Sequence, residues 1–335
     1  MIRTRRFFQC VVFLSIPFLF FEACTSQKAA VSAEEYYSLG MAYFELGKYE
    51  EAEHWLNRAR RVDKTKRASE YNLGRIAFET GRYEQAASIF ERILKDDPEN
   101  VMVLQAAAYS RIKTGEFEKA ESLYDRLLLL VPESADDGYN HALVLFAIDK
   151  AEQAEEVLLR YSYSLDENKD TLLLLARTQK AQGKVEALDN YAKWLQSNTD
   201  ISVQAEYAQV LENAEFYARA IEVYAEILKG TVPENSGLNK ADLRFDYARL
   251  LLIADEESEA GMNELRTAAA EGFSDTEKAR LLLEDERIKA DRAEEIRRIL
   301  SNAEEAEIKE ADMPEADPEG NPPPDSPEAL IPPEI

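Results

Sequence analysis

Cysteine and histidine are scarce in this chain of 335 residues, which contains two of each. The two histidines, His54 and His141, lie far apart in sequence, and neither has a partner at the spacing of a zinc site. The 12 glycines stand singly, so no glycine-rich loop is present to cradle a phosphate. We therefore expect no metal, no cofactor and no catalytic residue, and the chain is not predicted to be an enzyme.

Positive charge is also in short supply. Lysine and arginine number 40 against 65 aspartates and glutamates, which gives a formal net charge of -25. A surface this acidic is repelled by nucleic acid and by anionic lipid headgroups. Nucleic acid is therefore excluded as an expected partner.

One basic cluster runs against this trend, and two interpretations of it stay open. Either its cations complement the dipole at the end of a helix, or they contact anionic headgroups or an acidic partner. The cluster consists of Arg58, Arg60, Arg61, Lys64, Lys66 and Arg67.

A period of 34 residues is the strongest signal in the sequence. It separates Gly47, Gly81 and Gly115. The same interval relates a set of alanines, namely Ala52, Ala86, Ala120 and Ala154. Self-similarity at this period is typical of stacked helix-turn-helix units, each too small to bury its apolar face alone.

Within a unit, the residues specify two helices and a turn. Glycine at Gly47 supplies the left-handed conformation that ends the first helix. A small residue at Gly40, Gly74 or Ala108 allows the two helices to approach closely. Proline at Pro98 cannot continue the second helix.

This pattern resembles the tetratricopeptide repeat family. Three units carry the resemblance most strongly, through Leu39-Gly40, Tyr43, Gly47, Tyr49, Ala52 and Ala59, then Leu73-Gly74, Gly81, Tyr83, Ala86, Phe90 and Pro98, then Gly115, Phe117, Ala120, Tyr124 and Pro132. The resemblance implies an all-α, right-handed superhelical solenoid with about six repeats over residues 33–234. Residues 235–300 are expected to form a degenerate repeat, fitted at Ala248 and Ala260, and a helical cap that starts with a capping box of Ser274 and Glu277.

The resemblance also implies where a partner binds. In this family, one face of each first helix lines a concave groove that holds a protein or peptide. Mapped onto this chain, that face carries Tyr37, Met41, Phe44, Tyr71, Arg75, Phe78, Gln105, Tyr109, Ile112, Tyr139, Leu143 and Phe146. Aromatic side chains there suit the binding of a peptide, although some of them are alternatively packed between helices.

The N-terminus has the features of an export signal. Arginines precede an apolar run from Phe7 to Phe21 that is short for a membrane span, and Ala23-Cys24 follows. This resembles a bacterial lipoprotein signal, of the loose form seen in spirochaetes. The resemblance implies a signal peptide over 1–23, cleavage between Ala23 and Cys24, lipid on Cys24 and a tether over 24–32. An uncleaved anchor, or cleavage elsewhere, is the alternative.

The resemblance places the protein in the bacterial cell envelope, held by acyl chains in the outer membrane and facing the periplasm. Covalent lipid would be needed there, because so acidic a protein does not adhere to a membrane by charge.

The C-terminus differs in composition from the rest. Residues 301–335 hold eleven acidic residues, one basic residue and eight of the 12 prolines. Such a segment cannot bury enough apolar surface to fold alone. It is predicted to be a disordered, solvating tail, or alternatively a recruitment arm with Ala329, Leu330 and Ile331 as an apolar hook.

Two functions are compatible with these features. The first is a lipid-anchored envelope scaffold that binds partner proteins through the groove. The alternative is a periplasmic accessory of a transporter that handles small apolar ligands.

The lipid anchor gives a direct prediction. Incorporation of a radioactive fatty acid into the protein should require Cys24, because no other cysteine follows the apolar run. Labelling that survives the Cys24→Ser substitution would refute the anchor.

Overall fold

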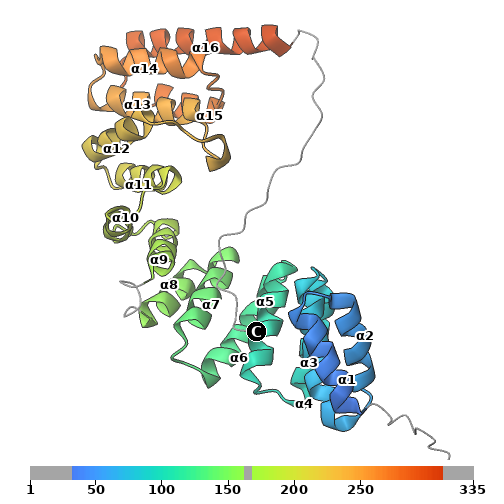
Figure 1. Cartoon of the computed structure of the whole chain (residues 1–335). Coiled ribbons are helices and arrows are strands. Elements are labelled where there is room, and N and C mark those ends of the chain that lie inside the picture. Colours follow the sequence, from blue (N-terminus) through green and yellow to red (C-terminus); the bar gives the residue numbers. More distant parts are fainter. Residues whose placement is uncertain (1–31, 162–167, 312–335) are drawn as a thin grey trace, which may run out of the picture. The chain divides into compact units, whose positions relative to one another are not determined.

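The computed structural model describes residues 32–161 and 168–311, and Figure 1 shows these residues as helices joined by short connections. Sixteen α-helices and one short 3-10 helix (η2, Glu234–Ser236) occur in these ranges, which contain no strand. The prediction of an all-α repeat fold is confirmed for the described residues.

The chain divides into two compact units, Met1–Lys66 and Arg67–Ile335. In the first unit, helices α1 (Ala33–Glu45) and α2 (Tyr49–Ala59) pack against each other as an antiparallel pair. Helix α3 (Asp63–Glu79) begins in the first unit and continues into the second.

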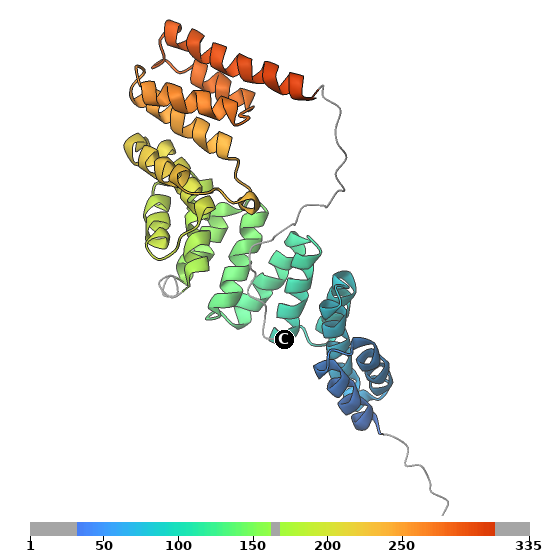
Figure 2. The same ribbon diagram turned by 45° about the horizontal axis from the view of Figure 1, so that its top comes forward.

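The second unit is a succession of helices in which each one packs against the next in sequence from α4 to α14 (Figure 2). Helix α16 closes the succession by packing on α14 and α15. The helices are α4 (Tyr83–Asp96), α5 (Val101–Lys113), α6 (Phe117–Leu130), α7 (Ala135–Ala147), α8 (Ala151–Arg160), α9 (Lys169–Ala181), α10 (Ala187–Leu195), α11 (Ile201–Asn213), α12 (Tyr217–Lys229), α13 (Lys240–Ala254), α14 (Glu259–Ala270), α15 (Thr276–Leu283) and α16 (Ala290–Ala311).

Left-handed residues end the first helix of several pairs, as the sequence predicts. Gly47 and Gly81 have φ angles of 69° and 73°. Where the repeat lacks glycine, Asp149 and Glu215 adopt the same conformation, with φ angles of 58° and 63°. The turn geometry is therefore kept at the cost of backbone strain in two non-glycine residues.

Small residues on the first helices permit the close packing within a pair. A Cβ atom added to Gly40 would lie 2.7 Å from Cγ of Leu56 in the first unit. In the second unit, a Cβ on Gly74 would lie 2.6 Å from Cε1 of Phe90, which is fully buried. Glycine at these positions therefore makes room for a large side chain of the second helix.

Two expectations about the last repeat and the cap are wrong. Ala260 is exposed, and the buried small residue is Gly261, which packs on Leu252. Helix α15 is capped by Asp275, whose carboxylate accepts from the backbone N–H groups of Glu277 and Lys278. Ser274 therefore forms no capping box. Aspartate precedes the helix directly and offers a charged acceptor.

The structure also corrects the boundary at the C-terminal end of the fold. Helix α16 runs to Ala311 and takes in the first residues of the segment expected to be a tail. Ser32, assigned to the tether, caps α1 through a capping box with Glu35. The signal peptide with Ala23 and Cys24, the remaining tether and residues 312–335 lie outside the described residues.

Among the helices that the structure describes, none is both long and apolar enough to cross a membrane.

The contact between Gly74 and Phe90 predicts that the effect of Gly74→Ala on the free energy of unfolding depends on which residue occupies position 90. Alanine gains about 1 kcal/mol of helix propensity over glycine, whereas the clash with a buried ring costs about 1–3 kcal/mol. We expect Gly74→Ala to lower the free energy of unfolding in the native background and to raise it in a Phe90→Ala background, where the side chain that the new methyl group would meet is absent. Urea titrations of the four proteins measure this cycle. An equal effect of Gly74→Ala in both backgrounds would contradict it.

Candidate partner-binding surface

In the first unit, the predicted groove residues lie on one helix. Tyr37, Met41 and Phe44 are spaced along α1 and are all half-buried. The ring of Phe44 meets the ring of Tyr49 edge-on at a centroid distance of 5.7 Å. The C-terminal end of α1 therefore uses Phe44 partly for packing against α2.

In the second unit, three of the predicted groove residues lie on α3. They are Tyr71, Arg75 and Phe78, and all are half-buried. The ring of Tyr71 packs against Phe90 with a centroid distance of 5.8 Å. Its hydroxyl is buried without a hydrogen-bond partner among the described residues, and burial raises the pKa of the Tyr71 phenol. An unpaired buried hydroxyl is unfavourable unless a further group reaches it.

Phe78 connects two repeats. Its ring lies 5.1 Å from Tyr83 of α4 and 5.3 Å from Tyr109 of α5, measured between centroids. The ammonium group of Lys113 lies 5.3 Å from the centre of the Tyr109 ring, within the range of a cation–π contact. We call Tyr71, Phe78 and Tyr109 the aromatic row.

A polar contact joins α5 to α7 beside the aromatic row. The side-chain amide of Gln105 donates to the carboxylate of Asp137 at 2.9 Å, and the Ser134 hydroxyl donates to the same oxygen at 2.6 Å. Asp137 is buried. The sequence analysis missed Asp137, although its position three residues after the cap Ser134 is a capping pattern that could have indicated it.

The remaining predicted residues lie closer to the core. Tyr139 is 5% exposed and Tyr109 is 7% exposed. Ile112, Leu143 and Phe146 are half-buried against the hydrophobic core. Tyr109 and Tyr139 therefore offer little surface, and the half-buried residues carry most of what a partner can touch.

Three of the six residues of the basic cluster contact other side chains of the fold. The guanidinium of Arg58 lies over the rings of Trp55 and Tyr36, at 5.1 and 5.6 Å from their centres. Lys64 forms an ion pair with Glu34 at 2.8 Å. In the second unit, Arg67 lies 3.5 Å from Asp97. These contacts favour a structural role for the cations.

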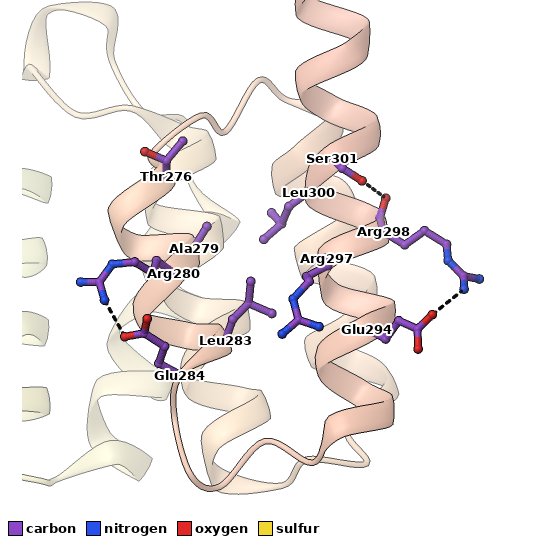
Figure 3. Close-up of a pocket in the computed structure, with 10 residues that line it drawn as sticks. All are labelled: Thr276, Ala279, Arg280, Leu283, Glu284, Glu294, Arg297, Arg298, Leu300 and Ser301. Atoms are coloured by element: carbon purple, nitrogen blue, oxygen red, sulfur yellow. Dashed lines mark hydrogen bonds and ion pairs between the residues drawn. The ribbon is translucent and has the colours of Figure 1, made fainter.

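The cavity between α15 and α16, shown in Figure 3, has a volume of about 730 Å³. Leu283 and Leu300 point into it from the two helices. Arg280 is paired with Glu277 and Glu284 of its own helix, and Arg298 with Glu294. The cavity is an apolar seam within the cap, bordered mostly by charges that are already paired.

No group of three or more histidine, cysteine, aspartate or glutamate side chains is placed to hold a metal ion in the part of the chain that the structure describes. His54 is exposed and stands edge-on to the ring of Trp55, at a centroid distance of 5.0 Å.

Comparison with known proteins agrees with this architecture. One tetratricopeptide-repeat family model matches residues 37–101 and a second matches residues 77–137. A tetratricopeptide repeat protein from Parabacteroides merdae has a similar solved structure, with 20% identity and a TM-score of 0.52, over 75% of this chain and 97% of that one. No curated protein matches the chain significantly.

Two weaker likenesses are to MamA from Desulfovibrio magneticus and to YrrB. MamA has 19% identity and a TM-score of 0.46, over 50% of this chain and 96% of its own. YrrB, described as a TPR protein with an unusual peptide-binding site, has 17% identity and a TM-score of 0.49, over 58% of this chain and 98% of its own. The matches to the family models identify tetratricopeptide repeats within residues 37–137, and the described helix pairs have the fold of such repeats.

The position of Tyr139 gives a prediction about alkaline pH. Burial raises the pKa of Tyr139 to about 12, above its ordinary value of 10. Stability from the neutral phenol is complete below pH 10 and is lost as the pH rises from 10 towards 12, because the unfolded chain ionises first. We expect Tyr139→Phe to lose less stability than the native protein between pH 9 and 11, as measured by urea titration. Equal losses would mean that the hydroxyl is open to solvent and available to a partner.

Proposed function

We propose that this protein is a lipid-anchored scaffold of the bacterial cell envelope that binds a partner protein through the first helices of its repeats. Tetratricopeptide-repeat proteins generally serve as protein-binding scaffolds rather than as enzymes. The anchor is assigned to Cys24 on the sequence signal alone.

The aromatic row is the observation that carries the binding site. The half-buried rings of Tyr71 and Phe78 are already fixed by neighbours and lose little conformational entropy on binding, which makes them good anchors for a peptide. The Tyr71 hydroxyl is itself buried, so a bound segment would contact the exposed parts of the rings rather than this group.

Charge restricts the kind of partner. The net charge of -25 disfavours an acidic protein at long range. Arg75 and Lys113 lie next to the aromatic row and give this part of the surface two positive charges. A client with an apolar segment and no large excess of negative charge fits these features best.

The alternative of an apolar-ligand carrier has no specific support. Four cavities in the described residues have charged side chains in their walls. An apolar ligand would leave those charges partly desolvated, which is unfavourable.

The test is recovery of a client from cells that carry variants of the aromatic row. Tyr71→Ala combined with Phe78→Ala should weaken partner binding by about tenfold or more, since each buried aromatic anchor is worth at least about 1 kcal/mol. Co-purification after crosslinking in cells, quantified by mass spectrometry, measures the loss.

Two controls separate binding from folding. Phe216→Ala removes an exposed aromatic residue outside the row and should leave recovery unchanged. Circular dichroism of the double variant should show native helicity. Unchanged partner recovery by a folded double variant would exclude the aromatic row as the binding site.

A further inference from the structure

The cavity between α15 and α16 leaves apolar surface open at the last helix pair of the described residues. Leu283 of α15 and Leu300 of α16 point into it (Figure 3), and both are only half-buried although they adjoin the hydrophobic core of the cap. A repeat array is normally closed by a terminal unit with a polar outer face. The volume of about 730 Å³ is in the range of cavities that hold a ligand.

Arg297 adds an unpaired positive charge to this cavity. Its side chain extends from α16 into the space between the two helices (Figure 3), and it forms no ion pair among the described residues. The other two arginines of the lining, Arg280 and Arg298, are paired with glutamates of their own helices. A segment that combines a carboxylate with an apolar side chain therefore complements the cavity.

The sequence after α16 contains such a segment. Residues 312–335 hold seven acidic residues and no basic one. Among them, Glu328 directly precedes the apolar run Ala329, Leu330 and Ile331. In an extended segment alternate side chains share one side, so Glu328 and Leu330 can face the cavity together.

The length of the chain allows this segment to reach the cavity. The lining ends at Ser301, whereas α16 continues to Ala311, so the chain has to return by about 15 Å at 1.5 Å per residue. The 17 residues 312–328 span up to about 55 Å when fully extended. Because the segment is tethered to the helix that carries Arg297, its effective concentration at the cavity is high.

We infer that residues 328–331 cover the cavity between α15 and α16 of their own chain. The carboxylate of Glu328 pairs with Arg297, and the side chain of Leu330 packs between Leu283 and Leu300, which removes these apolar surfaces from water. The acidic segment thereby closes the apolar end of the array. This contact requires neither the aromatic row nor lipid on Cys24.

Photo-crosslinking in the full chain, purified in detergent, tests the contact. A benzophenone amino acid in place of Leu330 keeps this position apolar, and mass spectrometry maps the peptides to which it links. We expect crosslinks to residues 276–301, which contain Leu283 and Leu300. The inference is overturned if no crosslink reaches residues 276–301.

A charge exchange tests the ion pair. Arg297→Glu should lower the yield of this crosslink by about two- to fivefold, the range for an exposed ion pair, and Glu328→Arg in the same chain should restore it. Arg61→Glu makes the same change at an exposed arginine of the basic cluster and should have no effect. Circular dichroism should show native helicity in all variants, because both arginines are exposed.

Two results of this exchange would contradict the inference. If the doubly exchanged chain keeps the low yield, Glu328 does not pair with Arg297. If Arg61→Glu lowers the yield and Arg297→Glu does not, the acidic segment lies on the basic cluster instead.

Isotope mixing decides which molecule supplies the segment. Chains with and without ¹⁵N are mixed before irradiation, and we expect crosslinks only between peptides of equal isotope content. Crosslinks that join labelled to unlabelled peptides in the proportion of the mixture would show that a second copy covers the cavity, which would overturn binding within one chain.

Discussion

The close approach of two helices at a small residue is the constraint on which the rest of the structure depends. On α3, Gly74 leaves room for the ring of Phe90, and on α1, Gly40 does the same for Leu56. A side chain at either glycine would push the pair apart, because protein interiors are close-packed and yield little. Every further pair repeats the problem of burying an apolar face that one pair cannot bury alone.

The same constraint shapes the candidate binding surface. Tyr71 and Phe78 lie three residues before and four residues after Gly74, so they share its face of α3. That face turns towards α4, where Tyr71 meets Phe90 and Phe78 meets Tyr83. The two rings are half-buried for this reason: both contact the second helix, and Phe78 also contacts Tyr109 of the next repeat. Rigid support of this kind is what a binding surface gains from a closely packed pair.

The sequence predicts the fold well because each repeat carries its own local signals. Glycine at a left-handed turn and alanine at a buried position are set by steric limits that act within a few residues. It predicts less where a different residue fills the same role. Asp149 and Glu215 keep the left-handed turn without glycine, and Gly261 takes the buried position expected for Ala260.

The sites were less predictable than the fold, because they depend on contacts between repeats. Repeat spacing placed Tyr109 and Tyr139 in the groove, but neighbouring helices bury both. A pocket that includes His141 gathers residues from α6, α7 and α8, and no local motif connects Asp125 with Glu156. Lone histidines carry no signal in the sequence, and this one becomes conspicuous only when its surroundings are known.

The central claim is that the first-helix face around Gly74 holds a partner protein. A photo-crosslinking amino acid at position 78, in living cells, tests this most directly, with position 88 on the exposed side of α4 as the comparison. The account predicts that position 78 crosslinks one defined protein and that position 88 does not. Crosslinking of that protein from position 88, with none from position 78, would contradict the account.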